Sequence, residues 1–277
     1  MLKPTRWQNL LLDVITLALT FVLLFPIIWL FFASFKSQAD LVGDPLQVLP
    51  TTFTLDGYRD IWKSIGFQAA FRNSLLVAGT TAIIVTTVGL MAACSLSRFS
   101  YRYRGMFSGG ILAMQMLPGI VIVVPLILIL QRLGLTNSLP GLIVAYMLLG
   151  LPVSVWMLKG YMDDIPPELD QAALIDGANY FQVLGLIIVP LLAPAIVAVG
   201  AFAFMLCWGE YLFALSLITS TDTKTLPLAL QAAVGQFQIN WGMLTAGGVI
   251  ISLPPAILFI FFQRWLVGGL TSGGVKG

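Results

Sequence analysis

Histidine is absent from this 277-residue chain, and charged residues make up only 9% of it. Soluble domains usually carry about 25% charged residues. Hydrophobic residues account for 58% of the sequence, and the mean hydropathy is +0.95. A water-soluble fold could not bury that much apolar surface, so most of the chain is expected to lie in a lipid bilayer. The net charge of +2 is too small to indicate a nucleic-acid partner.

The sequence also lacks the usual groups of catalysis and nucleotide binding. Without histidine, the commonest general base and a common metal ligand are missing. Cys94 and Cys207 lie far apart within apolar runs and form no CxxC spacing, so we interpret them as reduced packing residues. The chain contains no GxxxxGK[ST] run, the loop that phosphate cradling requires. We therefore predict no catalytic residue, no metal site, no cofactor and no ATP site in this chain.

Six apolar segments are long enough to cross a membrane as helices of about 20 residues. The first follows Lys3 and Arg6, but it is too long for a secretion signal and lacks a prompt cleavage site. The fifth is overlong, so its ends are expected to tilt or to leave the membrane. The predicted spans are Leu10–Phe35, Ser74–Leu96, Met106–Leu130, Leu139–Leu158, Leu186–Leu217 and Leu244–Leu266. The expected fold is all-α, a polytopic membrane protein.

Basic residues set the expected orientation, because loops rich in lysine and arginine stay in the cytoplasm. A cytoplasmic N-terminus puts eight of the 14 lysines and arginines inside and six outside. The cluster Arg98, Arg102 and Arg104 between the second and third spans is the strongest single indication. Both termini are then expected to be cytoplasmic, and so is the stretch between the fourth and fifth spans.

That stretch contains a short polar segment, PPELDQAALIDGA, between two long apolar runs. Prolines 166 and 167 suit the first turn of a helix, and acidic side chains near that end favour the helix dipole. The spacing places Leu169, Ala172, Ala173 and Asp176 on one face, which the paired alanines make thin enough for another surface to approach. Gly177 is expected to end the helix in the left-handed conformation, and a second helix is expected to begin near Asn179, interrupted by prolines 190 and 194.

Gln171-Ala172-Ala173-x-x-Asp176-Gly177-Ala178, followed by apolar residues up to Ile188-Val189-Pro190, resembles the EAA loop of ABC-importer permeases. The pattern of that family is Glu-Ala-Ala-x-x-x-Gly and an apolar stretch that ends in proline. Six spans, cytoplasmic termini and a loop before the penultimate span match the carbohydrate branch of these permeases. The tail Gly268–Gly277 is also similar to the ending of that branch.

The resemblance implies a type I ABC-importer transmembrane domain in the bacterial inner membrane. Residues 1–68 would form an N-terminal stub, the first span and a periplasmic loop, residues 69–266 the transmembrane core with the EAA loop at 160–190, and residues 267–277 a cytoplasmic tail. The implied partners are a second permease subunit, a dimer of ATP-binding subunits and an extracytoplasmic solute-binding protein. The implied substrate is a sugar.

In that family the EAA loop is a coupling helix that docks in a cleft of the ATP-binding subunit. This chain has Gln171 where the family usually has glutamate, so docking would depend on hydrogen bonds and shape, with Glu168 or Asp170 supplying the negative charge. The residues that the resemblance assigns to coupling are Glu168, Asp170, Gln171, Ala172, Ala173, Asp176, Gly177 and Ala178.

An ionisable residue inside a span usually faces a cavity or a partner. Glu210 is such a residue in the predicted fifth span, and Trp208 and Tyr211 beside it have flat faces that could stack on sugar rings. Gln115 in the third span is a second candidate for the solute path. Each of these side chains could instead serve packing between helices.

Two other functions fit a membrane protein of this size. An ion-coupled secondary transporter usually keeps several ionisable residues deep in its bundle, whereas Glu210 is the serious candidate here. An integral-membrane enzyme would need histidine, a metal-ligand cluster or paired carboxylates within a span. The sequence favours a permease subunit of an ATP-driven sugar importer. The spans offer no basic pocket for a phosphate, which favours a neutral sugar.

Overall fold

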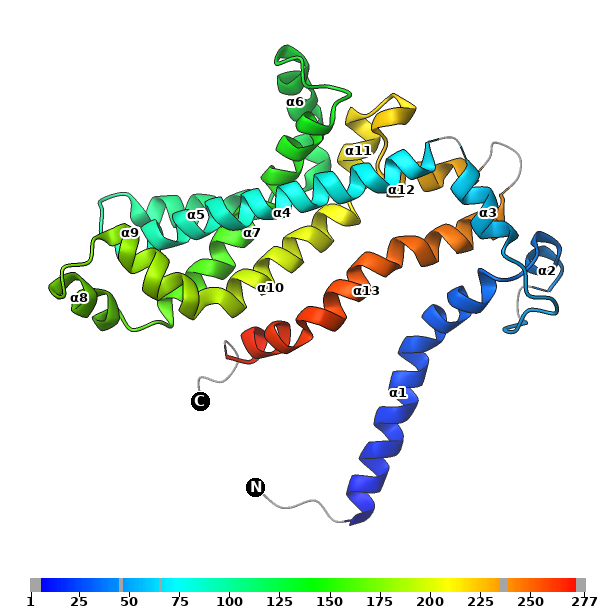
Figure 1. The fold of residues 1–277 in the computed structure, drawn as a ribbon, viewed down its shortest axis with the longest axis horizontal. Helices are drawn as coiled ribbons and strands as arrows, with labels where there is room; N and C mark the ends of the chain where they lie inside the picture. Colours follow the sequence, from blue (N-terminus) through cyan, green and yellow to red (C-terminus); the bar gives the residue numbers. More distant parts are fainter. Residues whose placement is uncertain (1–5, 45–46, 65, 235–238, 273–277) are drawn as a thin grey trace. The chain divides into compact units, whose positions relative to one another are not determined.

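The computed structural model describes residues 6–44, 47–64, 66–234 and 239–272. The chain divides into two compact units, which are described separately: Met1–Phe67 with Leu230–Leu253, and Gln68–Ala229 with Pro254–Gly277. Regular structure in the described residues of both units is helical (Figure 1).

The first unit contains α1 (Arg6–Ala33), α2 (Gln38–Gly43), α3 (Asp56–Lys63) and the beginning of α13 (Trp241–Ser272). The apolar side chains of α1 are exposed along most of its length, as expected for a helix whose solvent is lipid. Beyond α1 the chain folds back, and the side chain of Gln38 bonds the backbone of Ile239 and Gly242. These bonds tie α2 to the start of α13.

The second unit is built around α7 (Leu139–Asp163), which packs against α5, α6, α10 and α11 (Figure 1). Its core is apolar where α4, α7 and α10 meet, since Ala93, Leu158 and Val199 are fully buried together. The other elements in chain order are α4 (Phe67–Arg98), α5 (Arg104–Gln115), α6 (Gly119–Arg132), α8 (Glu168–Ile175), α9 (Tyr180–Gln182), the π-helix η1 (Val183–Ile188), α10 (Val189–Trp208), α11 (Leu212–Leu217), η2 (Thr221–Thr223) and α12 (Leu226–Leu230). The last residue of α12 and the short helix η3 (Gln231–Ala233) belong to the first unit.

Among the described residues, five helices are long and apolar enough to cross a membrane, and a bent pair of helices makes a sixth candidate span. The bent pair corrects the prediction of one continuous span at Met106–Leu130. The chain leaves α5 at Gln115 and starts α6 at Gly119, with an angle of 102° between the two helices. Pro118 lies in the break, where it lacks the N–H donor that a continuous helix would use.

The predicted fifth span is also corrected at both ends. Helical structure runs without a break from Tyr180 through η1 to Trp208, so prolines 190 and 194 do not interrupt it. The π-helical turn before Pro190 changes the hydrogen-bond spacing, which accommodates a residue without an N–H donor. The helix then ends at Trp208, and residues up to Leu217 belong to a separate short helix, α11.

Two asparagines hold the segment between α11 and α12. The side-chain oxygen of Asn137, a residue with φ of 53°, accepts hydrogen bonds from the backbone of Thr219 and Ser220. The amide of Asn73 donates to the carbonyl oxygens of Asp222 and Lys224. This segment is therefore fixed to the loop before α7 and to the start of α4.

Candidate functional site: the α8–α9 turn and a second polar cavity

The polar segment forms a short helix that closes its own hydrogen bonds at the C-terminal end. Gly177 has a φ of 91°, the N–H of Gly177 bonds the carbonyl of Leu174, and the N–H of Ala178 bonds the carbonyl of Ala173. This pair of bonds is a Schellman motif, and it satisfies carbonyls that the helix end would leave free. The predicted helix stop at Gly177 is confirmed.

The next helix, α9, starts at Tyr180 with Asn179 as its N-cap, as predicted. Asn179 and Gln182 form a capping box, because the side chain of each accepts a hydrogen bond from the backbone N–H of the other, at 3.0 and 2.8 Å. One helix thus ends and the next begins within residues 176–179. The turn between α8 and α9 has a defined shape without any contribution from another molecule.

The two faces of α8 differ from the predicted arrangement. Ala173 is only 9% exposed and packs against Met162, Val183 and Ile188, so it lies on the inner face. Ala172 is exposed, and the prediction that both alanines share a face open to another surface was wrong. Asp170 and Leu174 lie on the inner side with Ala173, and Ala178 packs against the same cluster. The exposed residues of α8 and its end are Glu168, Leu169, Gln171, Ala172, Ile175, Asp176 and Gly177.

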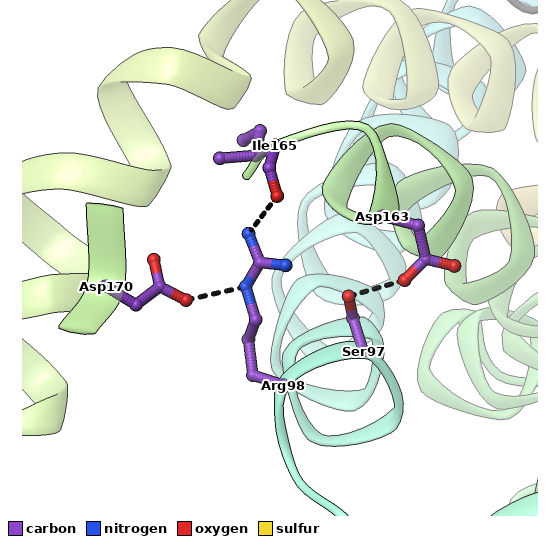
Figure 2. Close-up of polar contacts among 5 residues, drawn as sticks. All are labelled: Ser97, Arg98, Asp163, Ile165 and Asp170. Atoms are coloured by element: carbon purple, nitrogen blue, oxygen red, sulfur yellow. Dashed lines mark hydrogen bonds and ion pairs between the residues drawn. The ribbon is translucent and has the colours of Figure 1, made fainter. Parts of the chain in front are cut away.

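Asp170 is engaged within the chain. Its Oδ2 lies 2.7 Å from Nε of Arg98, the last residue of α4, and the two side chains are only 15% and 12% exposed (Figure 2). Nη2 of Arg98 also donates a hydrogen bond, at 3.0 Å, to the carbonyl oxygen of Ile165. One guanidinium group therefore holds both the linker before α8 and the first turn of α8.

A second polar contact joins α4 to α7 at the same end of the unit. The hydroxyl of Ser97 donates to Asp163 at 2.6 Å (Figure 2). Lys159 pairs with the other oxygen of Asp163 at 2.5 Å. Ser97 and Arg98 thus point to different partners. Ser97 fixes α4 to the end of α7, and Arg98 fixes it to α8.

A cavity of about 560 Å³ lies between α4, α8 and the start of the fifth span. Its lining is mostly apolar and includes the free thiol of Cys94, while Arg98, Asp170 and Gln171 supply polar groups. α4 and α8 are therefore not packed tightly over their whole facing length. Their polar contact is concentrated at the Arg98–Asp170 pair.

Sequence reasoning missed three residues around this turn. Ile175 and Phe181 are 85% and 87% exposed, which is unusual for large apolar side chains next to a polar helix. Both could have been found as apolar residues next to the predicted stop at Gly177. Arg98 served only as an indicator of orientation, because sequence gives no sign that it reaches a residue 72 positions later.

A second cavity, of about 270 Å³, brings Gln115 and Glu210 together. Gln115 ends α5 at the broken span, and Glu210 follows the end of α10. Pro152 of α7 lines the same cavity. Two polar residues that are 95 positions apart in the sequence thus share one small, largely apolar cavity.

Glu210 also has a structural role. Its Oε1 accepts from the N–H of Phe213 at 2.9 Å, and Oε2 accepts from the N–H of Ala214 at 3.2 Å. These bonds satisfy backbone donors in the first turn of α11. The carboxylate lies beyond the end of α10, which corrects its predicted place inside a continuous fifth span.

Trp208 and Tyr211 do not line this cavity. Trp208 is 3% exposed, stacks on Phe204 with ring centroids 5.5 Å apart and meets Phe71 edge-on at 6.0 Å. Its indole therefore contributes to packing of α10 on α4. Tyr211 is partly exposed and lies directly before α11.

Comparison with known proteins identifies the class of this fold. Residues 85–272, more than half of the chain, match the family described as "Binding-protein-dependent transport system inner membrane component". The chain belongs to this family. It is a multi-pass membrane permease subunit of an importer, which decides against the ion-coupled transporter and the membrane enzyme.

Several curated relatives match nearly the whole chain. The sulfoquinovosyl glycerol transport system permease protein SmoH of Agrobacterium fabrum is 36% identical over 92% of this chain and 89% of its own length. The trehalose transport system permease protein SugB of Mycobacterium tuberculosis is 35% identical over 99% of this chain and 98% of its own. The trehalose/maltose transport system permease protein MalG of Thermococcus litoralis is 31% identical, with 98% of each chain covered.

A solved structure shares the fold. The crystal structure of a bacterial ABC transporter involved in import of the acidic polysaccharide alginate matches with a TM-score of 0.79 and 20% sequence identity. The match covers 95% of this chain and 99% of that one. The helical arrangement is therefore that of an ABC-importer transmembrane domain, as predicted.

Proposed function

We propose that the exposed face of α8 and the α8–α9 turn form the surface on which an ATP-binding subunit docks. The turn is preformed by its Schellman motif and capping box, so a partner would meet a rigid shape. Ile175 and Phe181 would be the apolar anchors of that contact, because both side chains are almost fully exposed next to the turn. Ala172 lets the partner approach closely.

The negative charge for docking comes from Glu168 and Asp176. Both are exposed, whereas Asp170 faces Arg98 inside the chain. Gln171 is exposed and lines the 560 Å³ cavity. It would donate and accept hydrogen bonds at the position where the Glu-Ala-Ala pattern of the family has a charged glutamate. Asp170, Ala173, Gly177 and Ala178 would act from within the chain by giving α8 its place and its end.

The cavity shared by Gln115 and Glu210 is the candidate for the solute path. An amide and a carboxylate are suitable acceptors for the hydroxyl groups of a sugar. Residues at the break between α5 and α6 form part of the cavity lining. Trp208 and Tyr211, which sequence reasoning placed beside Glu210 as stacking groups, would act on the solute only indirectly, through the packing of α10 and the start of α11.

The chain would work with a second permease subunit, a dimer of ATP-binding subunits and a solute-binding protein, and it would hold no ATP site of its own. Both termini and the α8–α9 turn would be cytoplasmic, on the side that carries Arg98, Arg102 and Arg104. The relatives SmoH, SugB and MalG are all named for the transport of sugars or sugar derivatives, which supports a solute of this class.

The proposal is tested by expressing the chain with the ATP-binding subunit, second permease and binding protein from its own gene neighbourhood. We expect a complex that co-purifies, and that takes up a radiolabelled disaccharide into proteoliposomes only when ATP is enclosed with the ATP-binding subunits. Disaccharides, longer oligosaccharides and alditols compared in the same assay name the solute class. Uptake driven by an ion gradient without ATP would contradict the proposal.

A further inference from the structure

The ion pair of Arg98 and Asp170 is not explained by docking at the exposed face of α8. It lies on the other face, largely withdrawn from solvent, where charges are costly unless paired and are poorly screened by salt (Figure 2). We propose that Arg98 is a positioning residue that fastens α8 to the end of α4, so that a displacement of α8 by the ATP-binding subunit is delivered to α4. This inference rests on the proposed function, since it takes the exposed face of α8 as the surface that the partner moves.

The contacts of Arg98 suit this positioning role. Nε contacts Asp170 at 2.7 Å and Nη2 contacts the carbonyl of Ile165 at 3.0 Å. The contact with Ile165 is a hydrogen bond, whereas the contact with Asp170 is an ion pair in which Nε does not meet hydrogen-bond geometry. Together the two contacts hold one rigid guanidinium against two points of the segment. Ile165 precedes α8 and Asp170 lies in its first turn. The entry to α8 and its first turn are thus held against the last residue of α4.

The fifth span and α4 differ in how they are connected to α8. The fifth span follows α8 directly in the chain, through the turn at residues 176–179. α4 ends 70 residues before α8 begins, so it can respond only through non-covalent contacts. Ser97 does not serve this purpose, because it bonds Asp163 of α7.

Because a cavity lies between α4 and α8, the Arg98–Asp170 pair is needed to couple the position of one helix to that of the other. Met91 and Cys94 of α4 and Leu174 of α8 line the same space of about 560 Å³. Without the ion pair, α4 would contact α8 mainly through the apolar cluster around Ala173, against which Leu90 and Cys94 pack, and α8 could move into that space without carrying α4 with it. With the ion pair, the two helices keep their separation and move together.

The test compares the wild-type complex with the double variant Arg98→Gln, Asp170→Asn, which removes the pair without leaving a buried unpaired charge. We expect the variant to insert, to co-purify with the ATP-binding subunit and to hydrolyse ATP, while solute transported per ATP hydrolysed falls about tenfold. The matched control is Asp56→Asn, Arg59→Gln, which removes an exposed ion pair of α3. The control should transport as the wild type does.

Native Cys94 gives a second measurement. It lines the cavity, whereas Cys207 is buried, so a maleimide reports mainly on the space behind α8. In the wild type, the labelling rate should be the same with and without ATP plus vanadate. In the double variant the labelling rates with and without ATP plus vanadate should differ about fivefold, because α8 then moves without α4.

Three results would overturn the inference: a double variant that transports as much solute per ATP as the wild type, a variant that no longer binds the ATP-binding subunit, or wild-type labelling that changes with nucleotide as much as the variant's does. The second would mean that the pair serves assembly. If the wild-type complex itself shows no ATP-driven uptake, the proposed function has failed, and that result is distinct from all three.

Discussion

Arg98 and Asp170 form a 2.7 Å ion pair between the end of α4 and the first turn of α8, with only 12% and 15% of their side chains exposed. None of the described residues bonds Oδ1, the second oxygen of this carboxylate. The pair is therefore set in low-polarity surroundings in which each charge depends on the other. The strength of this pair can be measured in the isolated chain, whereas uptake and docking are measured in the assembled transporter.

Replacement of Asp170 by asparagine alone should destabilise the protein. The change leaves the guanidinium of Arg98 without its counter-charge, and breaking a buried pair in this way costs about 3 kcal/mol. Thermal unfolding in detergent should show a clearly lower midpoint. Asp56→Asn removes one partner of a pair whose side chains are 67% and 68% exposed, and it should shift the midpoint little. Equal shifts in the two variants would show that the Arg98–Asp170 pair is as weak as a surface pair.

Replacement of Gly177 by valine should abolish uptake while membrane insertion continues. The φ of 91° is strained for any residue with a β-carbon, at a cost of about 1–2 kcal/mol, and a β-branched side chain fits it worst. A β-carbon at this position would meet nothing within 4 Å, so the loss comes from the backbone and not from a clash.

Two controls bracket that experiment. Gly177→Asn should keep more uptake than the valine variant, because asparagine tolerates the left-handed conformation. Gly160→Ala, at a helical glycine of α7 that also has open space around it, should transport normally. Full uptake by Gly177→Val would contradict the assignment of the α8–α9 turn to coupling.

Replacement of Ala172 and of Ala173 by leucine should affect different properties, docking in the first case and stability in the second. Ala173→Leu places a large side chain against Met162, Val183 and Ile188, and overpacking of this kind destabilises by about 1–3 kcal/mol. Ala172→Leu adds the same side chain on the exposed face, so the melting temperature should hold while co-purification with the ATP-binding subunit is lost. If Ala172→Leu retains the ATP-binding subunit and full uptake, the exposed face of α8 is not the docking surface.

Glu210 can be separated into its two roles by conservative replacement. Glu210→Ala removes both bonds to the first turn of α11 and should cost about 1 kcal/mol of stability. Glu210→Gln keeps one acceptor oxygen, so its stability should stay near that of the wild type. If the carboxylate also contacts solute, the KM for uptake should rise in Glu210→Gln, and again in Gln115→Leu at the other side of the cavity. An unchanged KM in both variants would leave Glu210 with the capping role alone.

Much of the fold follows from local sequence signals. Apolar length located the five long membrane helices and the region of the bent pair, but not its break. Gly177 and Asn179 marked the end of one helix and the start of the next because each signal acts within a few residues. The positions at which helices break were harder to predict from sequence. Pro118 lies at the break between α5 and α6, whereas Pro190 and Pro194 lie within continuous helical structure, and no local pattern in the sequence distinguishes these prolines.

The faces of α8 show the limit of periodicity. A 3.6-residue repeat groups Leu169, Ala172, Ala173 and Asp176 without saying which side the rest of the chain covers. Ala173 turns inward because Met162 and Val183 offer an apolar surface there, and Asp170 turns inward because Arg98 reaches it from the end of α4. Both reasons are tertiary, and they involve residues too distant in sequence for a single chain to reveal.

The self-contained turn at residues 176–179 has a thermodynamic consequence. Its backbone N–H groups from Asp176 to Asn179 are all hydrogen-bonded within the chain, so ordering of this backbone adds little entropic cost to association at this place. If an ATP-binding subunit docks at this turn as proposed, its binding and release would depend on the exposed side chains around the turn, and the backbone between α8 and α9 would not need to refold.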